Sequence, residues 1–457
     1  MYIQIYQIHG LIRGKNLELG LDEDTGGQIV YVMELAHALA NLQEVTNVEI
    51  VTRLFNDDEH TGYSMPFEHI SDKLGIVRVP CGPSRYIKKV DIWKYLDEFY
   101  DNIDYYTDPN ENKPDIIHSN YVDSGYICNK LSKKFNIPHI FTAHSLGKPK
   151  FENLKTKSLD INKLDSTYVF SKRIPAEQKI IDNAGALVVS CDQEKLDQYS
   201  LYNIKQDDPK FKVITPGVNA KKFKPYWENR TFNKDLYDKA NKKILDKINS
   251  QLDNPDLPPI LMLGRLEAKK NFTNMIECYI DDKELQRNTN LIICAGKTTE
   301  RSLLSKEQLN LLTNIEQLIK NNNLERKVCL IDEVDYQIEV PELYRVIGSK
   351  KGIFVDCDTT DPLPFSIIEA AISGIPVVAH NTCALLNVIS KGKSELLINV
   401  RKHHLLSGAI FKLINNKELW EHCSKAGVEC ILNELTWDVT GKKMFNMYQE
   451  VIRNYKK

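Results

Sequence analysis

Short apolar runs alternate with amphipathic segments along the whole chain. In the first half, apolar runs predict buried strands at 2–8, 48–52, 76–79, 116–118, 139–142 and 186–189. In the second half, similar runs predict strands at 259–263, 290–295, 328–331, 352–355 and 376–379. Helical spacing fills the gaps, notably at 28–42, 308–319 and 366–373. Strands separated by helices are typical of a parallel sheet with right-handed crossovers.

The two halves predict two doubly wound α/β domains. Between them, Ile-Thr-Pro-Gly-Val-Asn at 214–219 is followed by a polar tract to about residue 256, which predicts an irregular joint. A final amphipathic segment at 438–455 has no strand after it. We therefore expect a first domain at 1–220, a linker at 221–256, a second domain at 257–436 and a helix at 437–457 that crosses back to the first domain. Ligands of such folds bind at the carboxyl ends of the strands, here in a cleft where the two domains face each other.

Composition agrees with this picture and excludes some partners. At about 150 residues per domain, 457 residues predict two or three domains. Sixty basic and 62 acidic side chains leave a net charge of −2, so no general attraction to nucleic acid or anionic membranes is expected. Any phosphate must instead be bound by a few placed cations.

The cysteines and the amino-terminal segment indicate the cellular compartment in which we expect the protein. The ten cysteines never form Cys-x-x-Cys, which favours buried free thiols over a zinc site or a disulfide framework. The chain begins with an alternating, strand-like segment that lacks the features of a signal peptide, and no run of 18 apolar residues predicts a membrane span. We expect a cytoplasmic protein.

Several polar segments of the first half follow predicted strands. The glycines of Asp-Thr-Gly-Gly-Gln at 24–28 precede a helix, where backbone N–H groups could bind an anion or a sugar oxygen, although a plain tight turn has the same pattern. His144 follows the strand at 139–142, with Lys148 close behind. Two cationic clusters, at 85–89 and 172–173, are typical of solvated faces as well as of phosphate sites.

The second half carries two comparable segments. Arg265 and Lys270 leave the end of the strand at 259–263 together, and a guanidinium and an ammonium in one loop suit a diphosphate. Asp361 and Glu369 lie eight residues apart around the start of a helix. Carboxylates accept hydrogen bonds from the hydroxyls of a ribose or hexose, but they could equally cap that helix.

Taken in order, these segments resemble the retaining GT-B glycosyltransferases of family 4, and most closely the sucrose-phosphate synthases. The matching motifs are His-Gly-Leu-Ile-Arg at 9–13, Asp-Thr-Gly-Gly-Gln at 24–28, Cys-Gly-Pro at 81–83, Thr-Ala-His-Ser-Leu-Gly-Lys at 142–148, Arg-Ile-Pro-Ala-Glu at 173–177, Pro-Gly-Val-Asn at 216–219 and Val-Pro-Glu-Leu-Tyr-Arg at 340–345. The segments at 144–147 and 173–177 distinguish this subgroup from other members of family 4.

The resemblance implies transfer of a hexosyl unit from a nucleotide sugar, most readily UDP-glucose, to fructose 6-phosphate, with no cofactor and no metal. It implies four catalytic residues: His144, Arg265, Lys270 and Glu369. It implies a donor site formed by Gly26, Gly27, Arg265, Lys270, Asp361, Phe365, Ser366 and Glu369. It implies an acceptor site formed by Gly27, Gln28, Arg85, Lys89, Lys148 and Arg173. A sucrose-phosphate phosphatase is a candidate partner.

The donor half departs from the family pattern. Asp361-Pro-Leu-Pro364 stands where Glu-Pro-Phe-Gly is usual, so Pro364 offers no backbone N–H and Asp361 is shorter by one methylene. Asn-Thr-Cys-Ala at 381–384 replaces an expected Asn-Gly-Gly-Pro turn. Two alternatives follow: a changed donor, as in mannosylfructose-phosphate synthases or other family-4 enzymes, or a catalytically degenerate homologue that binds sugar phosphates. Because His144, Arg265, Lys270 and Glu369 are all present, we favour an active enzyme.

Overall fold

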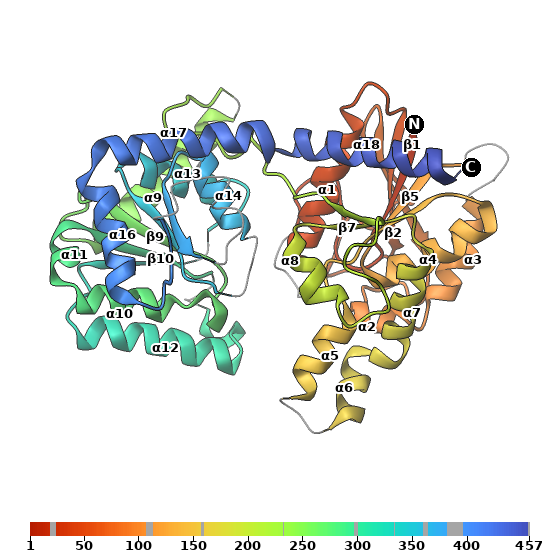
Figure 1. Cartoon of the computed structure of the whole chain (residues 1–457), viewed down its shortest axis with the longest axis horizontal. Coiled ribbons are helices and arrows are strands. Elements are labelled where there is room, and N and C mark those ends of the chain that lie inside the picture. Colours follow the sequence, from red (N-terminus) through yellow and green to blue (C-terminus); the bar gives the residue numbers. More distant parts are fainter. Residues whose placement is uncertain are drawn as a thin grey trace. The chain divides into compact units, whose positions relative to one another are not determined.

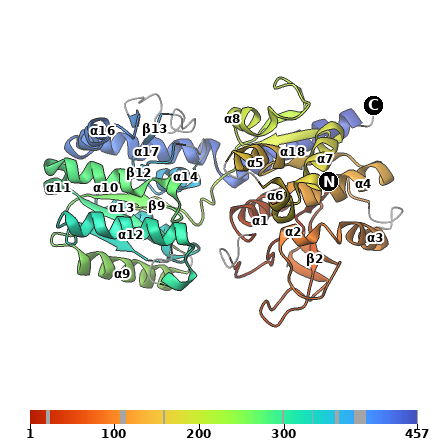
Figure 2. The same cartoon turned by 90° about the horizontal axis from the view of Figure 1, so that it is seen from below.

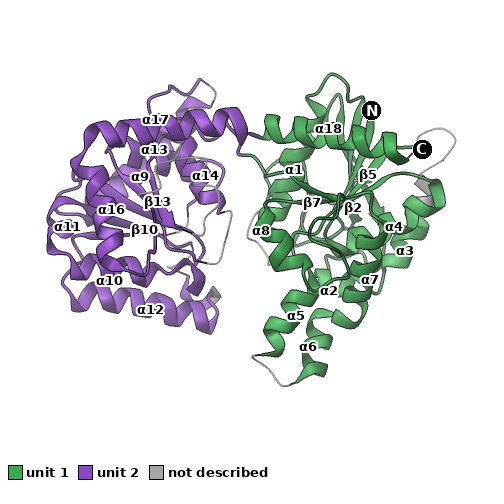
Figure 3. Ribbon diagram, in the orientation of Figure 1, with its two compact units in different colours: residues 1–217, 437–457 green, residues 218–436 purple. Residues whose placement is uncertain are grey.

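The computed structural model describes residues 1–18, 24–106, 113–156, 160–231, 233–296, 300–332, 334–359, 364–381 and 396–455. The chain forms two compact units, one of Met1–Gly217 with Trp437–Lys457 and one of Val218–Thr436 (Figure 3). The carboxyl-terminal helix thus belongs to the first unit. The eleven strands that the apolar runs predict are present, with ends shifted by at most two residues.

The first unit is built around a sheet of eight strands. They are β1 (Tyr2–Tyr6), β2 (Asn47–Leu54), β3 (Phe67–Ser71), β4 (Leu74–Pro80), β5 (Ile116–Asn120), β6 (His139–Thr142), β7 (Ala186–Val189) and β8 (Phe211–Val213). Their order across the sheet is β3-β4-β2-β1-β5-β6-β7-β8. All neighbours are parallel except the edge pair β3 and β4.

Helices cover both faces of this sheet, because its strands are apolar on both sides. Ile3 and Ile5 of β1 face one layer, formed by α1 and α18, whereas Tyr6 faces the other, to which α3 and α4 contribute (Figures 1 and 2). The helices are α1 (Gly27–Ala40), α2 (Lys89–Ile92), α3 (Leu96–Tyr106), α4 (Tyr121–Phe135), α5 (Gly147–Lys155), α6 (Ile161–Tyr168), α7 (Phe170–Asn183), α8 (Asp192–Glu194), the π-helical turn η1 (Lys195–Tyr199) and α18 (Trp437–Tyr455).

The second unit contains a smaller, fully parallel sheet. Its strands are β9 (Pro259–Leu263), β10 (Asn290–Cys294), β11 (Val328–Ile331), β12 (Ile353–Asp356), β13 (Val377–His380) and β14 (Leu397–Ile398). Their order is β11-β10-β9-β12-β13-β14. β9 and β12 are therefore neighbours, so residues that follow these two strands come together although they are far apart in the sequence.

Helices also lie on both faces of the second sheet (Figures 1 and 2). Leu261 of β9 packs into the cluster that α9, α13, α14 and α17 share, and Ile260 and Met262 pack into the cluster of α10, α12 and α16. The helices are α9 (Lys234–Gln251), η2 (Ala268–Lys270, a 3-10 turn), α10 (Phe272–Asp281), α11 (Lys283–Asn288), η3 (Arg301–Leu303), α12 (Lys306–Asn321), α13 (Glu339–Ser349), α14 (Phe365–Ile372), α16 (His403–Asn415) and α17 (Lys417–Glu434).

The expected irregular linker at 221–256 is only partly irregular, because half of it is helix α9. Ala240, Ile244 and Ile248 recur every four residues and form a narrow buried stripe, which packs against α13. The polar residues between them occupy the solvated side of the helix and hide this stripe in the sequence. The segment belongs to the second unit.

Among the described residues, no helix is long and apolar enough to cross a membrane. Nine cysteines lie in the described part of the chain; none of them forms a disulfide, and eight are buried. Cys383 lies outside the described residues.

Candidate functional site

The loop after β1 is joined to the predicted glycine turn. Gly10 has a φ of +86°, and a Cβ there would lie 2.8 Å from the carbonyl oxygen of Asp24, so only glycine fits this approach. The backbone N–H of Leu11 donates to Oγ1 of Thr25 over 3.0 Å. Strand β1 therefore fixes the turn that begins α1.

The glycines of this turn leave the start of α1 open. Gly26 is the N-cap residue, and a Cβ on Gly26 or Gly27 would meet no described atom within 4 Å. Packing therefore does not require glycine at either position. A ligand that approaches the backbone N–H groups would require it. Gln28 is held in place, since its Nε2 donates to Oε1 of Gln7 over 2.6 Å.

His144 occupies a strained turn directly after β6. Its φ is +55°, a conformation that costs a non-glycine residue on the order of 1–3 kcal/mol. Nε2 of the ring lies 2.9 Å from Oδ1 of Asn120, at the end of β5, and the ring packs edge-on against Tyr31. Burial, and secondarily the neighbouring His9, lowers the pKa of His144 to about 3. The imidazole is thus neutral at pH 7.

A buried histidine–carboxylate pair lies beside this turn. Nδ1 of His9 is 2.7 Å from Oδ2 of Asp123, and both side chains are almost wholly buried. Asp123 also accepts hydrogen bonds from the backbone and hydroxyl of Ser124. The ring of His9 meets the edge of Tyr121, which has a φ of +67°. No role was predicted for Asp123 from the sequence, because its contact with His9 depends on how α4 packs beside the loop after β1.

Arg173 anchors the backbone that follows His144. Its Nε lies 2.8 Å from Oε1 of Glu177, and one terminal nitrogen donates to the carbonyl oxygen of Ser145 over 2.8 Å. Both oxygens of Glu177 accept from the N–H of Gly147, the first residue of α5. The guanidinium also lies over the ring of Tyr121. Arg173 is therefore buried within the site rather than exposed to a ligand.

The other predicted acceptor cations differ in their surroundings. Nζ of Lys89 lies 2.6 Å from Oδ1 of Asp24, beside the glycine turn. Nζ of Lys148 donates to the carbonyl oxygen of Leu201 over 2.5 Å. Arg85 is exposed. A continuous series of contacts and peptide bonds leads from Lys89 to His144. We call its residues the β1–β6 cluster: Lys89, Asp24, Gly10, His9, Tyr121, Arg173, Ser145 and His144.

In the second unit, Arg265 and Lys270 leave the carboxyl end of β9 as predicted. Arg265 is 79% exposed and lies 3.1 Å from Glu267. Nζ of Lys270 lies 3.1 Å from Oδ2 of Asp358, which follows the neighbouring strand β12. A Cβ at Gly264 would lie 3.2 Å from Cδ of Lys270, so the glycine leaves room for the lysine stem. The sequence analysis did not identify Asp358.

Glu369 is buried and bound by two tyrosines. It is the fifth residue of α14, close to the start of the helix, as the sequence predicts. The hydroxyl of Tyr336 donates to Oε1 over 2.5 Å, and that of Tyr344 lies 3.3 Å from Oε2. Burial raises the pKa of Glu369, opposed by these hydrogen bonds and by Lys222, whose Nζ lies 3.5 Å from the centre of the Tyr336 ring.

The start of α14 connects Glu369 with Lys270. Oγ of Ser366 lies 3.5 Å from Oδ2 of Asp356, and Oδ1 of Asp356 accepts from the N–H of Asp358 over 2.8 Å. Phe365 is 43% exposed, and Pro364 takes the N-cap position with a φ of −69°. Asp361, Pro362, Leu363, Thr382 and Ala384 lie outside the described residues.

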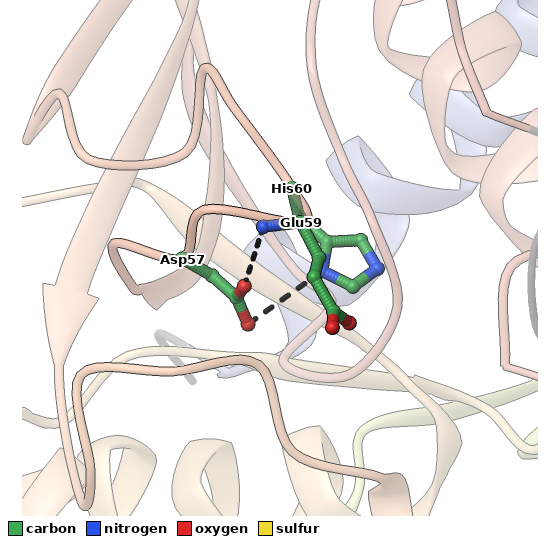
Figure 4. A group of neighbouring side chains, drawn as sticks. All are labelled: Asp57, Glu59 and His60. Carbon is green, nitrogen blue, oxygen red and sulfur yellow. Dashed lines mark hydrogen bonds and ion pairs between the residues drawn. The ribbon is translucent and has the colours of Figure 1, made fainter.

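A third group of polar side chains lies in the loop after β2. Ligand atoms of Asp57, Glu59 and His60 lie within 4.8 Å of one another (Figure 4). The Asp57 carboxylate accepts backbone hydrogen bonds from Tyr86 and Glu59, at 3.0 Å and 2.8 Å. These bonds lower the pKa of Asp57. The role of Asp57 is therefore to hold this loop in place through backbone hydrogen bonds.

Comparison with known proteins assigns both units. Residues 1–245 match the family described as the sucrose synthase first GT-B domain. The chain belongs to this family of GT-B glycosyltransferases. Residues 244–429 match the family described as glycosyl transferases group 1. The two α/β units are therefore the two domains of a GT-B fold, as the motifs predict.

The relatives include sucrose-phosphate synthases. The chain is 31% identical to probable sucrose-phosphate synthase 1 of Oryza sativa subsp. indica, over 94% of the chain and 44% of that protein. The chain thus spans less than half the length of this curated relative. A solved sucrose-phosphate synthase from Thermosynechococcus elongatus has a TM-score of 0.69 and 21% identity, with 99% of each chain covered. HepE of Anabaena, solved in complex with UDP-glucose, has a TM-score of 0.62 and 12% identity, covering 98% of this chain and 99% of that one.

Proposed function

We propose that this GT-B protein transfers a glucosyl unit from UDP-glucose to fructose 6-phosphate, with retention, and releases UDP and sucrose 6-phosphate. The bond from the anomeric carbon to the diphosphate oxygen breaks, and a bond from that carbon to the acceptor hydroxyl oxygen forms. The hydroxyl proton goes to the leaving phosphate, so no protein nucleophile is required. The observation that carries this proposal is the placement of Arg265 and Lys270 together at the end of β9.

The second unit would bind the donor. Arg265 and Lys270 would contact the diphosphate and stabilise the charge that develops on the leaving UDP. Glu369 would accept hydrogen bonds from the ribose hydroxyls, and its fixed position between two tyrosines supports this role. Phe365 and Ser366, with Asp361, would line the remainder of the donor site.

The β1–β6 cluster, together with residues of the first unit outside it, would bind the acceptor and the reacting sugar. Gly26, Gly27 and Gln28 would offer backbone and side-chain polar groups to both substrates. Lys89 and Lys148, with the exposed Arg85, would attract the acceptor phosphate. Arg173 would act through the turn that it anchors, which carries His144 toward the reacting carbon.

Donor turnover tests the proposal. The protein is incubated with fructose 6-phosphate and, separately, UDP-glucose, ADP-glucose, GDP-glucose or GDP-mannose, and release of free nucleoside diphosphate is measured. Release with UDP-glucose that requires fructose 6-phosphate supports the proposal. Adding a sucrose-phosphate phosphatase, the partner that this product would suit, should then yield sucrose.

Pro364 favours one alternative, in which the chain uses another donor. Proline at the N-cap of α14 offers no N–H to a donor sugar or phosphate. Release of GDP from GDP-mannose, without release of UDP from UDP-glucose, would indicate a mannosylfructose-phosphate synthase. Calorimetric binding of fructose 6-phosphate without turnover of any donor would indicate a non-catalytic sugar-phosphate-binding homologue.

A further inference from the structure

Lys270 and Asp358 form an ion pair at the carboxyl ends of two neighbouring strands. Nζ of Lys270 and Oδ2 of Asp358 are 3.1 Å apart. The Asp358 side chain is completely buried, and that of Lys270 is 15% exposed. The pair forms because β9 and β12 are adjacent and parallel, which brings together residues 88 positions apart.

We propose that Asp358 is a positioning residue that holds the Lys270 ammonium in place and weakens diphosphate binding at this site. This inference rests on the proposed donor function. Asp358 was not among the site residues predicted from the sequence. The proposal gives it a defined electrostatic effect on diphosphate binding. Asp358 acts through Lys270 and does not itself contact the donor.

Burial of Asp358 keeps Lys270 near it. Separating an ammonium from a fully buried carboxylate is unfavourable, because the carboxylate loses an opposite charge in a region with little water. A lysine ammonium has three N–H donors, so it can keep one on Asp358 and offer another to a phosphate oxygen. The lysine is therefore held in place before the donor arrives.

The same carboxylate partly neutralises the ammonium that a diphosphate would contact. Arg265 and Lys270 supply two positive charges at the end of β9, and Asp358 offsets one of them at 3.1 Å. Glu267, 3.1 Å from the exposed Arg265, is better screened by water and has a smaller effect. A site with lower net positive charge releases a nucleoside diphosphate product more readily.

Inorganic pyrophosphate tests this charge effect without depending on the nucleoside. Calorimetry would compare pyrophosphate binding by the full chain, Asp358→Asn and Asp253→Asn. The Asp253 variant is the matched control, since it makes the same change in net charge on the same unit, at an exposed carboxylate paired with Arg326. We expect Asp358→Asn to bind pyrophosphate about tenfold more tightly, and the control to stay within about twofold of the parent.

A double-mutant cycle identifies Lys270 as the mediator. In a Lys270→Ala background, Asp358→Asn should change pyrophosphate affinity much less than it does in the parent, because the positioned ammonium is gone. Asp358→Ser provides a second neutral variant should the asparagine variant fold poorly, with folding checked by circular dichroism. Unchanged or weaker binding by a folded neutral variant would overturn the proposal, as would an equal gain in both backgrounds.

The outcomes separate this inference from the proposed function. A parent chain that binds neither pyrophosphate nor UDP lacks a donor site, which overturns both. A parent that binds both ligands, with variants that do not differ from it, overturns only the role of Asp358. Tighter binding by Asp358→Asn in a chain that turns over none of the four donors supports the role of Asp358 and counts against the proposed transfer.

Discussion

Nε2 of His144 lies 2.9 Å from Oδ1 of Asn120, and this contact determines which ring nitrogen carries the proton. The amide oxygen only accepts hydrogen bonds, so Nε2 is the donor and Nδ1 keeps its lone pair. Because burial lowers the pKa of His144 to about 3, the ring stays neutral well below pH 7. In the proposed reaction, Nδ1 of His144 would therefore accept a hydrogen bond from a sugar hydroxyl, and the neutral ring would not act as a cation for a phosphate.

Replacing Asn120 by alanine should allow the proton of the His144 ring to occupy either nitrogen. The 15N shifts of His144, assigned with His144→Gln, should show a single Nε2-protonated form from pH 8 to pH 5 in the parent and a mixture of tautomers in Asn120→Ala. Transfer should fall about two- to thirteen-fold in the variant, since one buried hydrogen bond contributes roughly 0.5–1.5 kcal/mol. Titration of His144 in the parent near pH 6.5 would contradict the assignment.

Two other buried histidines should make the first unit sensitive to acid. Burial lowers the pKa of His118 and of His139 to about 3. An unfolded histidine binds a proton near pH 6.5, so the stability that each neutral ring provides is complete above that pH and is lost as the pH falls from 6.5 toward 3. The free energy of unfolding should drop by about 1.4 kcal/mol per pH unit for each histidine.

Helix α18 provides the readout of this acid effect. Nδ1 of His118 lies 2.6 Å from the hydroxyl of Tyr448 on α18, and Nε2 lies 2.8 Å from Oγ1 of Thr142. Amide exchange of α18 should accelerate between pH 7 and pH 5, after correction for intrinsic exchange. His118→Gln should reduce this pH dependence, and the exposed control His404→Gln should not. Equal pH dependence in all three proteins would refute the prediction.

The sequence predicted those parts of the fold whose apolar pattern is continuous. Central strands such as β7 (Ala186–Val189) and β10 (Asn290–Cys294) are buried on both faces and contain continuous apolar runs. The edge strand β3 was not predicted. Phe67 is exposed, and the polar residues of this strand leave no apolar run to recognise. Only three residues of α9 are buried, so its apolar stripe does not stand out among the charged residues around it.

Within the candidate site, local motifs were predictable and long-range partners were not. The position of Lys270 after β9 follows from the sequence, but its contact with Asp358 depends on the strand order β10-β9-β12. The sequence likewise assigned Arg173 to the acceptor phosphate as one cation among several. Only the fold reveals that its guanidinium contacts Glu177 and the carbonyl oxygen of Ser145.

Arg173→Ala should therefore destabilise the first unit strongly. Removing one partner of a buried ion pair leaves the Glu177 charge uncompensated, which costs about 3–5 kcal/mol. Lys172→Ala makes the same charge change at an exposed neighbour and should alter stability by less than about 0.5 kcal/mol. Urea denaturation, followed by far-UV circular dichroism, compares the two. Equal stability of both variants, with only acceptor affinity lost in Arg173→Ala, would instead make Arg173 a direct phosphate ligand.

Tyr336→Phe should separate nucleoside binding from phosphate binding. The Tyr336 hydroxyl donates to Oε1 of Glu369, the oxygen that in the proposed donor complex would also accept from a ribose hydroxyl. Removing this donor leaves the carboxylate available to the ribose, and a hydrogen bond to a charged group contributes about 1.5–3 kcal/mol. UDP should therefore bind at least several-fold more tightly, whereas inorganic pyrophosphate, which has no ribose, should bind unchanged.

Tyr226→Phe is the matched control for this variant, because it removes a phenol hydroxyl that accepts from Lys351 elsewhere on the second unit. Calorimetry with UDP and with pyrophosphate should give parent values for the control. If Tyr336→Phe weakens UDP binding while pyrophosphate binding holds, the hydroxyl supports the ribose instead of competing with it. If both ligands weaken together, Tyr336 maintains the whole donor site, and Glu369 is not an independent ribose acceptor.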